Sequence, residues 1–104
     1  MSNTLNDLYK IILSRKTADK TVSYVAKISA KGRKKIAQKV GEEAVETVIA
    51  ALAEGKEELV SESADLLFHL LILWADCGVT PAEVMAELER RREKGKNPEK
   101  PQQI

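Results

Sequence analysis

The chain has 104 residues, of which 43% are apolar and 32% are charged, and this length and composition predict one soluble, mostly helical domain. Seventeen basic and sixteen acidic residues give a formal net charge of +1, so no overall field draws the chain to nucleic acid or to an anionic membrane. The single Cys77 excludes an intrachain disulfide, one Cys and one His cannot form a zinc cluster, and no apolar run approaches the ~20 residues that span a bilayer.

Two features predict a cytoplasmic protein. Residues 1–10 lack the basic and then apolar layout of a secretory signal. A lone cysteine is typical of a reducing compartment. We therefore expect a cytoplasmic protein that binds neither nucleic acid nor a membrane.

The first predicted helix begins at Asn3 or Thr4, since both residue types are common N-caps. It should fray within residues 14–21. A short helix is expected over residues 23–30, and Gly32 then interrupts the basic stretch KGRKK, which predicts a loop of a kind that often holds anions. The apolar residues of the first helix recur at helical spacing: Leu5, Leu8, Ile11 and Ile12.

Two long helices follow, over residues 33–53 and 56–77. Gly41 is the one weak position in the first of them. Gly55 offers a stop between the two helices, and Gly78 ends the second. This arrangement predicts an antiparallel helical hairpin.

The last helix starts with the pattern of a capping box, in which Thr80 is the N-cap, Pro81 the first helical residue and Glu83 the third. No strand pattern longer than a few residues is present. We expect an all-α domain over residues 1–94 and a flexible C-terminal tail over residues 95–104, which is polar and contains two prolines.

The predicted helix 56–77 is apolar around most of its circumference. Such a helix must be nearly surrounded, and a small monomer offers too few partners, so a homodimer is expected. The polar residues of its middle and end fall in a stripe about 60° wide, formed by Glu62, Asp65, His69 and Asp76.

The two long helices place acidic pairs opposite each other. In an antiparallel hairpin that turns near Gly55, residues whose numbers add to the same total lie at the same height. Glu46 then faces Glu62, and Glu43 faces Asp65. Within each pair the spacing of three residues keeps both carboxylates on one face.

Four carboxylates beside an apolar wall cannot all stay ionised without compensation, because burial and like charge both raise their pKa values. Mg²⁺ would solve this problem, since it takes oxygen ligands and shares its shell between carboxylates and substrate phosphates; Mn²⁺ suits the same ligands. The predicted metal ligands and catalytic residues are Glu43, Glu46, Glu62 and Asp65.

A simpler interpretation stays open from spacing alone. Glu43 and Glu46 would then belong to a solvated helix face that also carries Lys35 and Lys39, and the other two acids would favour the early turns of their helix through its dipole. His69 fits a hydrogen-bonded core histidine better than a ligand. Phe68 and Trp74 are expected in the core, and the basic residues Arg15, Lys16, Arg33, Lys34 and Lys35 are individually solvent charges, some of which would meet a phosphorylated substrate.

Two stretches resemble one enzyme family. IAQKVGEEAVETVIAA at 36–51 and SESADLLFHLLIL at 61–73 closely resemble the phosphoribosyl-ATP pyrophosphohydrolases, as do RK at 15–16 and SYVAKI at 23–28. The resemblance covers roughly residues 5–92. The two acidic pairs alone would indicate only the wider superfamily of all-α, MazG-type nucleotide pyrophosphohydrolases, and Phe68 stands where such sequences often have Tyr.

The resemblance implies a MazG-like bundle of four to five helices, assembled as a homodimer. It also implies Mg²⁺ held by the four acids, and cleavage of phosphoribosyl-ATP to phosphoribosyl-AMP and pyrophosphate in the second step of histidine biosynthesis. Arg15, Lys16, Ser23 and Tyr24 would bind the ribose-phosphate and base end of the substrate, and Lys39, one turn before Glu43, would contact phosphate. The chain looks like a stand-alone form of the enzyme.

Hydrolysis of the α–β phosphoanhydride needs an in-line water, and Glu46 is the acid expected to orient or deprotonate it. Two alternatives remain open. A house-cleaning pyrophosphohydrolase for free nucleoside triphosphates would use the same acids. A helical dimerisation module without catalysis would use the acidic stripe only for solubility.

Overall fold

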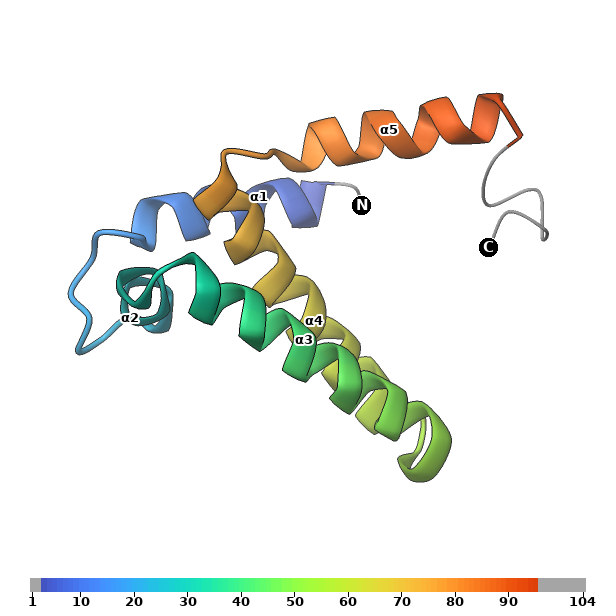
Figure 1. Ribbon diagram of the computed structural model, residues 1–104, viewed down its shortest axis with the longest axis horizontal. Coiled ribbons are helices and arrows are strands. Elements are labelled where there is room, and N and C mark those ends of the chain that lie inside the picture. The colour runs from blue at the N-terminus through green and yellow to red at the C-terminus, as the bar shows by residue number, and fades with distance from the viewer. Residues whose placement is uncertain (1–2, 96–104) are drawn as a thin grey trace.

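The computed structural model describes residues 3–95, and in that range the chain is all-α with no strand, as predicted (Figure 1). The predicted tail lies outside the described residues except for Gly95. The elements are α1 (Asn3–Arg15), α2 (Tyr24–Lys31), α3 (Arg33–Ile49), the π-helical turn η1 (Ala50–Glu54), α4 (Lys56–Cys77) and α5 (Pro81–Glu93).

The helical hairpin expected from the sequence is formed by α3 and α4, which run side by side in opposite directions (Figure 1). The Thr47 hydroxyl on α3 shares its one proton between the carbonyl of Glu43 in its own helix at 2.8 Å and the carbonyl of Glu62 on α4 at 3.2 Å, and the second contact helps to align the two helices. The turn differs from the prediction in two ways. The last five residues before Gly55 form a π-helix, and Gly55 itself is extended (φ 169°), so it does not act as a left-handed cap.

The hydrophobic core lies at the end of the hairpin away from this turn. There α1 packs against α4, and α2 packs against α3 (Figure 1). Phe68 and Trp74, predicted in the core, are partly buried and pack against its edge. The largest side chains with almost no exposure are Ile12, Ile36, Leu71 and Ile72.

Local caps explain where the shorter helices begin. Ser23 caps α2 by accepting the N–H of Ala26, and the predicted capping box of Thr80 and Glu83 is present at α5. At α1, in contrast, neither predicted cap is one, because Asn3 is already the first helical residue and Thr4 the second. Gly78 adopts the left-handed conformation (φ 75°) that ends α4, as expected from its position.

An ion pair that the sequence did not reveal joins the start of α3 to the end of α4. The Arg33 guanidinium donates to the carboxylate of Asp76 at 2.7 Å and to the carbonyl of the same residue at 3.0 Å. Asp76 is therefore separate from the other acids of its predicted stripe. Arg33 is exposed, as expected of a solvent charge, and in addition links the two helices at the open end of the hairpin.

The expectation that α4 is nearly surrounded is wrong for the single chain. Its buried residues all lie from His69 onward, while Val60 in the N-terminal half and Leu67 near the middle are exposed. Large apolar side chains of α3 and η1 are exposed as well, namely Val45, Val48, Ile49 and Leu52. The reason is geometric, because α1, α2 and α5 all lie toward the other end of the hairpin (Figure 1).

Among residues 3–95, no single helix combines the length and the apolar character needed to cross a bilayer. Only α4 and α5 taken as a pair meet these criteria, and the pair is bent by 106°.

The core makes a direct prediction about stability. Ile72 is 1% exposed, so replacing it with Ala leaves a cavity that the packed helices cannot fully close. We expect Ile72→Ala to lower the free energy of unfolding by about 3 kcal/mol in urea denaturation. Val22 is 79% exposed in the loop before α2, and Val22→Ala should change it by less than about 0.5 kcal/mol. Equal effects of the two substitutions would contradict this assignment of the core.

Candidate functional site

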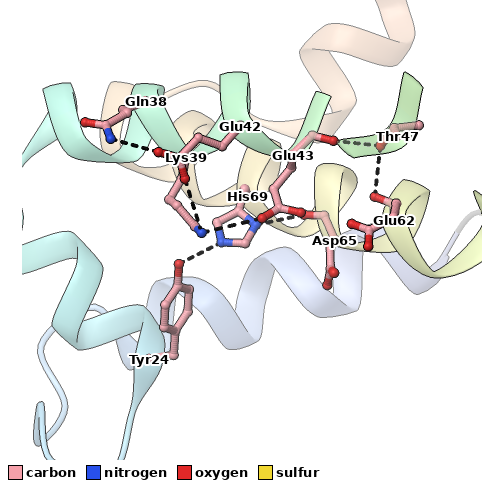
Figure 2. A network of polar contacts seen from close by, with 9 residues as sticks. All are labelled: Tyr24, Gln38, Lys39, Glu42, Glu43, Thr47, Glu62, Asp65 and His69. Atoms are coloured by element: carbon pink, nitrogen blue, oxygen red, sulfur yellow. Dashed lines mark hydrogen bonds and ion pairs between the residues drawn. The ribbon is translucent and has the colours of Figure 1, made fainter. Parts of the chain in front are cut away.

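Acidic side chains from both arms of the hairpin meet in one cluster. Glu43 on α3 and Glu62 and Asp65 on α4 each offer a carboxylate oxygen, and these three oxygens lie within 4.8 Å of one another (Figure 2). Glu43 is only 6% exposed, so it does not belong to a solvated helix face. The alignment predicted from the sequence thus brings these three acids together.

Two oxygens of the cluster are buried without a partner. They are Oε1 of Glu43 and Oε1 of Glu62, and neither has a hydrogen-bond donor among the described residues. The other oxygen of Glu43 lies 3.5 Å from the Lys39 ammonium. Burying a carboxylate oxygen without a donor costs free energy. A cation or a hydrogen-bond donor placed beside either atom would therefore stabilise the site.

The surroundings of Glu62 also disfavour its ionised form. Burial, with the neighbouring carboxylates of Glu46, Glu43 and Asp65, raises the pKa of Glu62 above its ordinary value. Glu46 is therefore close to the cluster, although it is solvent-exposed and is not one of the three converging ligands. The fourth predicted acid lies at the open edge of the group.

Thr47 holds the two arms of the cluster together, and the sequence analysis did not single it out. Its hydroxyl lies 2.8 Å from the carbonyl of Glu43 and 3.2 Å from the carbonyl of Glu62 (Figure 2). A threonine inside a helix often bonds to the carbonyl four residues earlier. The signal that was available is its position beside Glu46, on the side of α3 that faces α4.

His69 is a hydrogen-bonded core residue, as the simpler interpretation held. Its Nδ1 lies 2.8 Å from the carbonyl of Asp65, which can only accept, so in the neutral ring Nδ1 carries the proton. Nε2 then accepts from the Tyr24 hydroxyl at 2.7 Å (Figure 2). Burial raises the pKa of Tyr24, which keeps its hydroxyl protonated for this bond.

Aromatic rings form a wall beside the acids. The His69 ring makes edge-to-face contacts with Tyr24 and with Phe68, with 5.5 Å between ring centroids in both pairs. Tyr24 and Phe68 lie 6.3 Å apart. Phe68 therefore contributes to packing around the site and has no polar atom to offer it.

Basic residues gather on the α2 side of the cluster. Lys39 contacts the carboxylates of Glu42 and Glu43 at 3.5 Å each, and Gln38 donates to Glu42 at 2.8 Å (Figure 2). Lys39 and Tyr24 also line a pocket of about 240 Å³. The other residues that line it are Lys27, Ile28, Lys31, Lys35 and Glu42.

The remaining predicted substrate residues are placed differently. The Lys16 ammonium donates to the carbonyl of Ala75 at 3.4 Å, ten residues and hence about 15 Å along α4 from Asp65. The Ser23 hydroxyl oxygen is used by the cap of α2. Arg15 is exposed at the end of α1. Of the five predicted substrate residues, the structure brings Tyr24 and Lys39 next to the acids.

The donor set suits a hard divalent cation. All the converging atoms are carboxylate oxygens, two of them buried and unpartnered, and Mg²⁺ or Mn²⁺ would supply the missing positive charge. His69 uses both ring nitrogens in other bonds, so it is not available as a ligand in this arrangement. The residues that could hold the ion are Glu43, Glu62 and Asp65, with Glu46 at the edge.

Comparison with known proteins identifies the family. The family model described as phosphoribosyl-ATP pyrophosphohydrolase matches residues 5–92. A Paramagnetospirillum magneticum protein named phosphoribosyl-ATP pyrophosphatase is 68% identical over 90 residues, which cover 86% of this chain and 83% of the relative. Proteins of the same name from Saccharolobus solfataricus (57% identity; 88% of this chain and 99% of the relative) and Rhizorhabdus wittichii (56%; 88% and 86%) are also similar.

The matched range, residues 5–92, spans both arms of the hairpin and the positions of all four acids. The all-α fold and the resemblance noted in the sequence agree with it. This chain belongs to the phosphoribosyl-ATP pyrophosphohydrolase family.

Proposed function

We propose that this chain hydrolyses phosphoribosyl-ATP to phosphoribosyl-AMP and pyrophosphate, with a divalent cation held by Glu43, Glu46, Glu62 and Asp65. The observation that supports the site most directly is the pair of buried, unpartnered carboxylate oxygens that meet from opposite helices. In a non-catalytic dimerisation module these buried oxygens would only destabilise the fold. Membership of the family supports the substrate over free nucleoside triphosphates.

When bound, Mg²⁺ would neutralise charge on the phosphoryl oxygens and on the pyrophosphate leaving group. The four carboxylates provide its binding site. Glu46 lies at the exposed edge of this group beside the Glu62 carboxylate, where its own carboxylate can orient a water molecule and accept its proton in addition to contacting the cation. This assigns Glu46 the role of general base.

The residues around the acids position them. Thr47 ties the backbones of Glu43 and Glu62, and the bond from His69 to the carbonyl of Asp65 is held from the other side by Tyr24. Lys39 keeps one oxygen of Glu43 turned toward it and reaches the pocket beyond, where it can contact a phosphate. Tyr24 offers a half-exposed ring to the base of the substrate.

We further infer a homodimer that covers the bare face of the hairpin. Val45, Val48 and Leu52 follow helical spacing and form one apolar stripe, and Val60 and Leu67 form a second on α4. A second copy of the chain offers a self-complementary surface for both stripes.

The reaction is the second step of histidine biosynthesis, which we place in the cytoplasm.

Replacement of a buried acid tests the site and the substrate together. We expect Glu43→Gln to lower kcat/KM for phosphoribosyl-ATP with Mg²⁺ by at least about 100-fold, because a ligand is lost while the helix is kept. Pyrophosphate release from phosphoribosyl-ATP and from a panel of nucleoside triphosphates would be measured, with circular dichroism as the check on folding.

Glu57→Gln is the matched control, since Glu57 is an exposed acid in the first turn of α4. Its activity should stay near that of the original chain. Full activity of Glu43→Gln would overturn the assignment of the site. Faster release of pyrophosphate from free triphosphates than from phosphoribosyl-ATP would favour the house-cleaning alternative.

The raised pKa of Glu62 predicts how stability depends on pH without metal. The folded state holds the proton of Glu62 more tightly than the unfolded state, so the chain loses stability as pH rises from the ordinary carboxyl value of 4.5 through the raised pKa. Glu62→Gln removes this loss. In EDTA we expect the variant to have the higher Tm near neutral pH, with the gain disappearing below pH 4.5.

Thermal melts across this pH range check the prediction. The same melts with added Mg²⁺ test whether the cation relieves the repulsion between the acids. The cation should raise the Tm of the original chain more than that of Glu62→Gln. Glu57→Gln again serves as control. A lower Tm for Glu62→Gln at neutral pH in EDTA would show that the cluster is not under electrostatic stress.

The dimer can be tested at the stripe. Leu52 is 83% exposed in the single chain, so Leu52→Glu should leave the fold intact but place a charge in the interface. We expect light scattering after size exclusion to give a dimer for the original chain and a monomer for the variant. Val22→Glu, at an exposed valine away from the hairpin, should remain dimeric. A monomeric original chain would contradict the proposal.

A further inference from the structure

Four lysines spaced four residues apart converge on one pocket beside the acid cluster. Lys27 and Lys31 share a face of α2, and Lys35 and Lys39 share a face of α3. Gly32 joins the two helices with a positive φ of 96°, a conformation that favours glycine, and this bend folds one lysine pair against the other. All four side chains line the same pocket of about 240 Å³.

Three of these ammonium groups are unused by the protein. Lys39 contacts two carboxylates, but within residues 3–95 no hydrogen bond or ion pair involves the side chains of Lys27, Lys31 or Lys35. The one acid that lines the pocket is Glu42, whose pKa is lowered by the hydrogen bond from Gln38 and by the charges of Lys39 and, more weakly, Lys35. The pocket is thus lined by four lysines and one acid, and this excess of positive charge suits an anion with several free oxygens.

The position of the pocket indicates which end of the substrate it receives. Lys35 lies eight residues before Glu43, about 12 Å along α3, and Lys31 lies beyond the bend. The acids and their cation would hold the triphosphate, so the pocket faces the opposite end of the molecule. Tyr24 lies between the two regions, because its hydroxyl bonds to His69 while its side chain lines the pocket.

We propose that Lys27, Lys31 and Lys35 form the subsite for the phosphate monoester of the phosphoribosyl group. This assignment rests on the proposed function and explains how the site distinguishes phosphoribosyl-ATP from ATP, which lacks that group. A phosphate monoester carries nearly two negative charges at neutral pH and has three free oxygens, which matches three lysines from two helices. Arg15 and Lys16 are then not needed for this phosphate.

The test uses Lys31→Gln/Lys35→Gln in the full chain. We expect KM for phosphoribosyl-ATP to rise about 10-fold or more for each lysine removed, with kcat changed less than about 3-fold, because the contact is equally strong in the ground state and the transition state. Lys56→Gln/Lys94→Gln removes the same charge from exposed residues outside the pocket and should leave KM unchanged. An unchanged KM in the pocket variant, or an equal rise in the control, would overturn the proposal.

A binding measurement separates this subsite from the catalytic proposal. The ³¹P resonance of ribose 5-phosphate should shift on addition of the metal-free original chain and of the Glu43→Gln variant, but not of Lys31→Gln/Lys35→Gln. This result is expected even if phosphoribosyl-ATP is not hydrolysed, in which case only the proposed function fails. If Lys27→Gln/Lys31→Gln binds ribose 5-phosphate as the original chain does, the assignment of these lysines to the subsite is wrong.

Pyrophosphate distinguishes the two ends of the substrate. The same titration with pyrophosphate should not depend on Lys31 and Lys35 if the pocket receives the phosphoribosyl end. Pyrophosphate binding that is tighter than that of ribose 5-phosphate and is lost in Lys31→Gln/Lys35→Gln would assign the lysines to the triphosphate and overturn the proposal.

Discussion

The alignment of α3 with α4 is the constraint on which the rest of the site depends. Like charges on facing helices would be relieved by a small slide of one helix along the other, since each residue advances an α-helix by about 1.5 Å. Two contacts oppose that slide. Thr47 bonds to the carbonyl of Glu62 near the cluster, and Arg33 holds Asp76 at the open end of the hairpin. The repulsion is therefore retained in the fold and is available to be relieved by a bound cation.

The two ends of the hairpin differ in how they are packed. At the open end, α1 and α2 cover the helices and form a core around Ile12, Ile36 and Ile72. At the turn, the apolar side chains of both arms remain bare in the single chain. The acids lie between these regions, with one side against packed aromatic rings and the other open to solvent at Glu46 and Asp65. A partner on the bare face would stiffen the arms that carry the metal ligands.

Much of this was predictable because periodicity and turn length determine a two-helix hairpin almost completely. Once the helices around Gly55 were recognised, the facing of Glu43 and Glu62 followed from counting. The Arg33–Asp76 pair belongs to the same hairpin, and because its numbers add to 109, next to the total of 108 for the acids, the same counting could have found it. The shared pocket of the lysines depends instead on how α2 meets α3, and periodicity carries no information on that. The π-helical turn was also unexpected, because its alanine-rich sequence suits an ordinary α-helix equally well.

The arrangement of charges also explains why neutral side chains lie between the acids and the lysines. Unit charges of opposite sign 4 Å apart attract by about 4 kcal/mol near a protein surface, so direct pairing would occupy the groups that the substrate and the cation need. Lys39 is the one lysine of the pocket that reaches the acids within the described part of the chain. Tyr24 and His69 bond to each other and fill the remaining space. The acids thus stay free for a cation while the lysines stay free for an anion, which is the separation a substrate with phosphates at both ends requires.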